Sequence, residues 1–286
     1  MVKGTDNLTN RKKLCLIMRK LIAAIGCAIF VAVAGHAAKF EQLKVKSPSM
    51  GREIPVNILT PDAPGRYPVA YLLHGHGSGC EKWITIKPEL EARADSLGLI
   101  IVMPTGDNSW YWDSPVDPSM KFETFISKEL VDYVDSRYPT VADSGHRFIT
   151  GLSMGGQGSL WNAVNHPDVF GTMGSLSGGV DITFSPESWN IKDALGPIEE
   201  NRERWESFRL PNRVEQFKDG GQAIIITCGT EDFFFGINED LHKKLLDAKV
   251  PHHYITSPGG HTDQYWAELI DYHLLFFLNN LKNQAK

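Results

Sequence analysis

Short runs of consecutive apolar residues recur along the chain, each bounded by glycine, proline or polar residues. Runs of this length without polar alternation are typical of strands buried on both faces of a parallel sheet. Two earlier segments, 40–45 and 53–59, alternate more and predict a β-hairpin. The buried strands are expected at 69–73, 99–103, 147–150, 172–176, 223–227 and 252–256.

Helical periodicity appears between these runs. Pro88 in a first turn and Gly98 just past an end delimit one helix, at 88–96. Strands that alternate with helices predict an α/β fold, a mostly parallel twisted sheet with helices on both faces. Such a sheet places its functional loops at the carboxyl ends of the strands. The other helices are expected at 122–137, 157–165, 237–248 and 265–281.

The segment 179–220 interrupts this alternation of strands and helices. It is longer than a simple crossover and contains Trp189 and Trp205. We interpret it as a helical insertion or a lid over the site. A surface excursion without a catalytic role is the alternative.

The N-terminus has the pattern of an export signal. Basic residues precede the apolar run 21–34, and small residues follow up to Ala38. The pattern predicts a signal peptide over 1–38, with Met18 as a possible start, and a domain over 39–286 that is secreted or periplasmic. An uncleaved anchor is an alternative. Lipidation at Cys27 is less favoured, because the apolar run continues beyond it. No membrane span is expected after leader removal.

Composition limits the classes of partner and cofactor that we expect the protein to bind. Apolar residues make up 42% and charged residues 22%, as in globular domains, and the formal net charge is −5. A chain without a basic stripe is not expected to bind nucleic acid. No metal or other cofactor is expected, since Cys80 and Cys228 lack zinc-site spacing. These two cysteines are interpreted as separate buried residues, or alternatively as one bridge.

Ser153 lies in the sequence Gly-Leu-Ser-Met-Gly at 151–155. This G-x-S-x-G motif follows a predicted strand and precedes a predicted helix, which is the context of a nucleophile elbow. The glycines avoid collisions in a strained turn, and the serine oxygen is exposed at a helix N-terminus. Ser153 is therefore the predicted nucleophile.

A serine hydroxyl needs a base, and the base needs an acid to orient it. The order in α/β-hydrolases is serine, acid, histidine. His261 follows two glycines after the last predicted strand, so it is the predicted base. Asp232 follows the strand at 223–227 and is the preferred acid, with Glu231 as its rival.

An oxyanion hole requires two backbone N–H donors. Met154, the residue after the nucleophile, is expected to supply one. The glycine-rich segment 74–79 follows the strand at 69–73, and His76 is assigned the second.

The chain resembles a known esterase family. The segments 71–75, 151–156 and 259–261, with 103–111, are similar to those of the family that includes tributyrin, feruloyl and acetylxylan esterases, S-formylglutathione hydrolases and mycolyltransferases. The resemblance extends from about Gly51 to Leu278. It implies the α/β-hydrolase fold, a triad of Ser153, Asp232 and His261, and donors at His76 and Met154.

Trp110 and Tyr111 follow a predicted strand at the expected active-site edge. Their rings are predicted either to stack on a sugar or aromatic acyl group or to form ordinary pocket walls. The preferred substrate is a short acyl or hydroxycinnamoyl (feruloyl or acetyl) ester of a carbohydrate. A general short-chain carboxylesterase is the alternative, followed by a thioesterase or an acyltransferase. A carbohydrate-binding protein with an idle site is the competing class.

Overall fold

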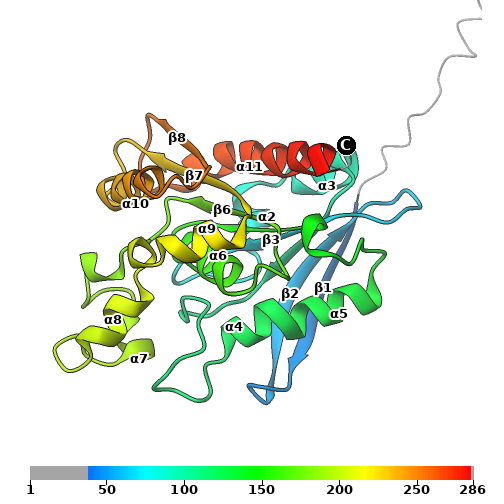
Figure 1. The fold of residues 1–286 in the computed structure, drawn as a ribbon. Coiled ribbons are helices and arrows are strands. Elements are labelled where there is room, and N and C mark those ends of the chain that lie inside the picture. Colours follow the sequence, from blue (N-terminus) through cyan, green and yellow to red (C-terminus); the bar gives the residue numbers. More distant parts are fainter. Residues whose placement is uncertain (1–37, 285–286) are drawn as a thin grey trace, which may run out of the picture. The chain divides into compact units, whose positions relative to one another are not determined.

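The computed structural model describes residues 38–284, which are built on one eight-stranded sheet with the order β1-β2-β4-β3-β5-β6-β7-β8 (Figure 1). The β1–β2 hairpin is antiparallel, and β2 also runs antiparallel to β4. All neighbours from β4 to β8 are parallel, which confirms the predicted α/β-hydrolase fold. The strands are β1 Lys39–Ser47, β2 Arg52–Thr60, β3 Val69–Leu73, β4 Ile100–Pro104, β5 Arg147–Gly151, β6 Thr172–Leu176, β7 Ala223–Gly229 and β8 His253–Ser257.

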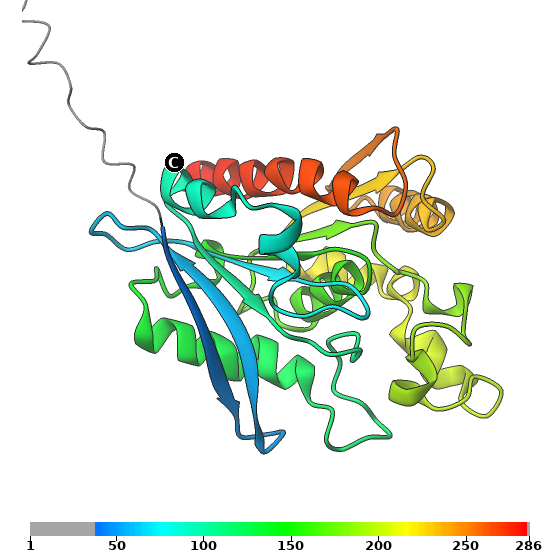
Figure 2. The ribbon, with the colours of Figure 1, turned by 180° about the vertical axis from the view of Figure 1, so that it is seen from behind.

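Two apolar clusters cover the two faces of the sheet. α2, α3 and α11 pack on one face, and α5, α6, α9 and α10 contribute to the cluster on the other. Figure 1 and the reverse view in Figure 2 show α11 and α5 on opposite sides of the strands. The α-helices are α2 Lys82–Ile86, α3 Leu90–Leu97, α4 Phe122–Thr124, α5 Leu130–Arg137, α6 Met154–Asn165, α7 Ile191–Leu195, α8 Arg202–Phe208, α9 Val214–Gly220, α10 Phe235–Asp247 and α11 Asp263–Gln284.

The predicted elements correspond closely to these bounds. β3 and β6 coincide with the predicted strands, and Gly98 ends α3 in the left-handed conformation at φ 61°. The predicted helix at 122–137 is divided, because a π-helical turn over Phe125–Glu129 separates α4 from α5. A short helix, α2, was not predicted.

The insertion between β6 and β7 is helical, as expected, and contains α7, α8 and α9. Its interior is organised by Trp205, which is fully buried and donates its indole N–H to the Gly196 carbonyl at 2.9 Å. Arg209 makes a bidentate ion pair with Asp181, at 2.8 and 2.5 Å, and so joins two parts of the insertion. Arg209 holds the pKa of the Asp181 carboxyl below its usual range, against the opposing effect of burial.

The predicted leader, except for Ala38, lies outside the described residues, so its cleavage stays a prediction. Within residues 38–284, no helix has the length and apolar character needed to span a bilayer.

Candidate active site

Ser153 lies between β5 and α6 in a sharp turn with φ 55° and ψ −117°. This backbone conformation is sterically unfavourable for a residue with a side chain, and neighbouring glycines make room for it. A Cβ on Gly151 would lie 2.5 Å from the Gly155 carbonyl oxygen, and one on Gly155 would lie 2.5 Å from that of Leu73. The strand–elbow–helix geometry predicted around Ser153 is therefore present.

His261 lies in the loop after β8 and connects Ser153 to Asp232. Its Nε2 lies 2.9 Å from Ser153 Oγ, and its Nδ1 lies 3.0 and 2.9 Å from the two Asp232 carboxylate oxygens. An ionised carboxylate only accepts, so Nδ1 carries the proton and Nε2 is free to accept from the serine hydroxyl. This is the tautomer that a general base requires.

Burial and a backbone hydrogen bond hold the Asp232 carboxylate in place. Its side chain is completely buried, and its Oδ1 accepts the Phe234 N–H at 2.8 Å. Glu231, the rival acid, is exposed. The structure thus brings together Ser153, Asp232 and His261, as the sequence predicted.

Two other histidines that follow or flank the last strands have different partners. His252 Nε2 contacts His242 Nδ1 at 2.7 Å. His273 is buried against the sheet between Thr150 and Thr227, and burial lowers its pKa to about 3.

The two predicted oxyanion donors flank the serine. Met154 is the first residue of α6, where backbone N–H groups have no acceptor within the helix. Gly75 passes so close that a Cβ there would lie 3.3 Å from Ser153 Cβ. The adjacent His76 lines the same pocket as Ser153, and its Nε2 lies 2.8 Å from Asn190 Oδ1 of the insertion.

The pocket at Ser153 has a volume of about 310 Å³ and combines apolar rings with a charged pair. Trp189 and Phe233 stack with ring centroids 5.9 Å apart. Phe233 is 49% exposed and its ring lies 4.4 Å from that of His261. Lys82 Nζ lies 2.5 Å from Asp263 Oδ1 and 5.9 Å from the Trp266 ring.

These pocket residues were not predicted individually. Phe233 could have been found, because it directly follows the predicted acid. The insertion contributes Trp189 to the pocket, which favours the lid interpretation over a remote excursion.

The stacking wall expected at Trp110 and Tyr111 is a wrong prediction. Trp110 is 2% exposed and Tyr111 is fully buried, and neither lines the pocket. Both residues adopt left-handed φ angles, 57° and 61°, and their rings are buried in the interior. Trp110 stacks on Trp112 at 5.5 Å and donates its indole N–H to the Trp189 carbonyl at 3.0 Å.

Cys80 and Cys228 are separate, buried and unbridged, which agrees with the preferred interpretation. Burial raises the pKa of the Cys228 thiol to about 12. Among residues 38–284, no three His, Cys, Asp or Glu side chains are grouped so that they could hold a metal ion.

Comparison with known proteins assigns the chain to a family. The family model described as "Putative esterase" matches residues 47–277. The chain belongs to this esterase family. The chain is 37% identical over 156 residues to the MPT51/MPB51 antigen of Mycobacterium tuberculosis, covering 54% of this chain and 50% of that protein. It therefore spans about half the length of that relative.

Other similar proteins are aligned over more of their own length. An acetyl esterase of Caldicellulosiruptor saccharolyticus is 26% identical over 212 residues, covering 70% of this chain and 79% of that protein. Among solved structures, the fluorophosphonate-binding serine hydrolase F of Staphylococcus aureus has a TM-score of 0.75 at 24% identity, covering 85% and 99% of the two chains. A ferulic acid esterase has a TM-score of 0.73 at 25% identity, with the same coverages.

Proposed function

We propose that the protein hydrolyses carboxylic esters through an acyl-enzyme formed on Ser153. The observation that carries the proposal is the continuous hydrogen-bonded chain from Ser153 Oγ through His261 to Asp232. Membership of the esterase family supports the same chemistry.

The reaction proceeds in two halves. Ser153 Oγ attacks the ester carbonyl while its proton passes to His261 Nε2, and the oxygen of the resulting tetrahedral intermediate accepts from the N–H groups of Met154 and His76. His261 then donates the proton to the departing alcohol, which leaves the acyl group on Ser153. A water molecule, deprotonated by the same imidazole, attacks the acyl carbonyl; His261 then returns the proton to Ser153 Oγ as the bond from the acyl carbon to that oxygen breaks and the acid leaves. The buried Asp232 stabilises the imidazolium in both halves.

We propose a hydroxycinnamoyl or short acyl ester of a carbohydrate as the substrate. Phe233 supports the acyl part, because an apolar ring that is half exposed beside the catalytic histidine offers a face to a flat aromatic group. The Lys82–Asp263 pair beside Trp266 supports a sugar alcohol, since it supplies both donors and acceptors next to an aromatic ring. The likeness to a ferulic acid esterase agrees with this choice.

Turnover of a panel of esters tests the proposal. Feruloyl, acetyl and butyryl esters, each of a sugar and of a simple alkanol, separate acyl preference from alcohol preference. We expect feruloyl sugar esters to have the highest kcat/KM. Preference for acetyl or butyryl esters regardless of the alcohol would instead identify a general short-chain carboxylesterase. Absence of turnover across the panel would contradict the ester-hydrolase assignment.

A variant at Phe233 tests the aromatic contact. Phe233→Ala should lower kcat/KM for feruloyl esters relative to alkyl acetates by about threefold to tenfold, since ring contacts contribute roughly 0.5–1.5 kcal/mol beyond burial. Phe184→Ala is the matched control, because Phe184 is equally exposed but does not line the pocket. Equal losses on all esters would show that Phe233 only supports His261.

A further inference from the structure

Tyr111, which does not reach the pocket, makes an unusual set of contacts in the interior. Its hydroxyl accepts the backbone N–H of His74 at 2.9 Å and donates to the carbonyl of the same residue at 3.1 Å. One phenol therefore satisfies both main-chain groups of the residue that begins the glycine-rich loop after β3. This arrangement holds His74 in place independently of any β-ladder.

The imidazole of His74 makes further hydrogen bonds to main-chain groups. Its Nε2 accepts the Gly106 N–H at 2.8 Å, so Nδ1 must carry the proton of the neutral ring. Nδ1 then donates to the Gly75 carbonyl at 2.7 Å. His74 is 1% exposed, and burial lowers its pKa, which keeps this ring neutral.

The Gly75 carbonyl and the His76 N–H belong to one peptide unit. In a planar trans peptide these two groups point in opposite directions. When His74 holds the carbonyl, it thereby directs the His76 N–H away from the imidazole. That N–H is the second donor assigned to the oxyanion hole.

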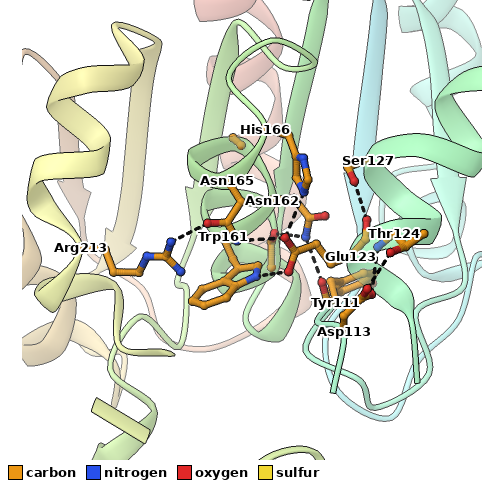
Figure 3. Close-up of polar contacts among 12 residues, drawn as sticks. Tyr111, Asp113, Glu123, Thr124, Ser127, Trp161, Asn162, Asn165, His166 and Arg213 are labelled. Atoms are coloured by element: carbon orange, nitrogen blue, oxygen red, sulfur yellow. Dashed lines mark hydrogen bonds and ion pairs between the residues drawn. The ribbon is translucent and has the colours of Figure 1, made fainter. Parts of the chain in front are cut away.

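Tyr111 is also attached to the helix that carries the first donor. Asn162 of α6 donates its side-chain N–H to the Tyr111 carbonyl at 3.0 Å, and Figure 3 shows this contact. The ring lies against Gly158 of the same helix, where a Cβ would be 2.5 Å from Tyr111 Cδ2. A Cβ on Gly106 would be 2.1 Å from Tyr111 Cε1, so the ring fills the space left by two glycines.

We propose that Tyr111 is a positioning residue that sets the two oxyanion donors relative to each other, by joining the α6 helix of Met154 to the loop of His76. The inference rests on the proposed function. It replaces the stacking role expected for Tyr111 from the sequence. The residue never touches the substrate in this role and acts through His74 and the Gly75–His76 peptide.

Tyr111→Phe is the decisive variant, because it removes only the hydroxyl. We expect kcat for a short alkyl ester to fall about 10-fold to 100-fold, the loss that follows when reacting groups are held slightly out of place. KM should stay within about threefold, since the pocket wall is unchanged. The variant also leaves two buried backbone groups unpaired, so kinetics must be measured at a temperature where the protein is fully folded by circular dichroism.

Tyr71→Phe is the matched control. Tyr71 is a fully buried tyrosine of β3 whose hydroxyl has no hydrogen-bond partner. Its loss should leave kcat and KM at parental values. A change in Tyr71→Phe equal to that in Tyr111→Phe would show that kcat responds to any lost buried hydroxyl, and would overturn the proposal.

Inhibition by a boronic acid is a second measurement, which tests the oxyanion donors. An alkylboronic acid binds when Ser153 Oγ donates a lone pair to boron and its proton passes to His261, which gives a tetrahedral anionic adduct. The inhibition constant of butylboronic acid should rise in Tyr111→Phe by a factor similar to the fall in kcat, and should not change in Tyr71→Phe. An unchanged inhibition constant in Tyr111→Phe would contradict the inference.

Asn162→Ala keeps the test decisive if Tyr111→Phe does not fold. It removes the bond from α6 to the Tyr111 carbonyl, and we expect kcat to fall about threefold to tenfold with KM unchanged; parental kcat would overturn the proposal. Failure of the proposed function has a different signature. In that case the parental protein itself neither hydrolyses the esters nor binds the boronic acid.

Discussion

Ser153, Asp232 and His261 come from three loops, and each of them depends on a specific local geometry. Ser153 has a backbone conformation that only its glycine neighbours permit, and Asp232 is buried and holds the imidazole of His261.

Ser153→Ala should fold normally and lose ester turnover by on the order of 10³-fold or more, because members of a triad act as one unit. Thermal unfolding of the variant checks the fold, and initial rates on an alkyl acetate check activity. Retention of near-parental turnover by purified variant would exclude Ser153 as the nucleophile.

Asp232→Asn should reduce kcat far more than Glu231→Gln. The amide at 232 can no longer accept from His261 Nδ1 as a carboxylate does, whereas Glu231 is an exposed side chain next to it. Both variants change one carboxylate to an amide in the same loop, so they are matched in charge. A larger loss in Glu231→Gln would reverse the assignment of the acid.

At the scale of elements, α6 packs unusually close to the end of β3. The approach is possible because Gly155 has no side chain: a Cβ there would lie 2.5 Å from the Leu73 oxygen and 2.6 Å from the His74 oxygen. These atoms are backbone and cannot move aside without displacing the strand. The contact thus fixes α6 against the loop after β3.

Gly155→Ala should therefore destabilise the protein by about 1–3 kcal/mol, as overpacking does, and lower kcat as well. Gly236→Ala is the control, because a Cβ at this position of α10 would meet open space. That variant should be neutral or more stable by up to about 1 kcal/mol. Urea unfolding measures both effects, and equal midpoints for the two variants would contradict the close-packing argument.

At the scale of the whole molecule, one buried histidine couples stability to pH. His273 of α11 lies under the sheet with Thr150 of β5 and Thr227 of β7 on its two ring nitrogens. Burial lowers its pKa to about 3 in the folded state, whereas an unfolded histidine has a pKa of about 6.5.

Above pH 6.5 His273 is neutral in both states and its titration does not affect stability. As the pH falls below 6.5, the unfolded state binds a proton that the folded state does not, so unfolding is favoured by about 1.4 kcal/mol per pH unit. The free energy of unfolding should therefore fall more steeply between pH 6.5 and 4.5 in the parental protein than in His273→Gln. Parallel curves for the two proteins would refute this coupling.

Export is the other prediction for the whole chain. The pattern of residues 1–38 predicts an exported protein whose mature chain begins near Ala38 or Lys39. Intact mass and N-terminal sequencing of the exported protein measure this. Exported protein that keeps residues before Leu21 would contradict cleavage at the predicted site.

The order of strands and helices could be read from the sequence, because buried parallel strands and amphipathic helices leave different periodicities. The proximity of the three predicted triad residues could be predicted as well. Each of them follows a strand, and the carboxyl ends of parallel strands meet at one edge of the sheet. Ser153, Asp232 and His261 therefore converge although more than a hundred residues separate the first from the last.

Only the tertiary structure shows which aromatic residues line the pocket. Trp110 and Tyr111 follow a strand just as Asp232 and Phe233 do, and their sequence context gives no sign of which rings face the solvent. Trp110 and Tyr111 combine left-handed backbone angles with buried rings, while Phe233 remains exposed beside His261. Side-chain direction in a loop depends on such single dihedral angles and on the packing that stabilises them, and neither leaves a periodic pattern in the sequence.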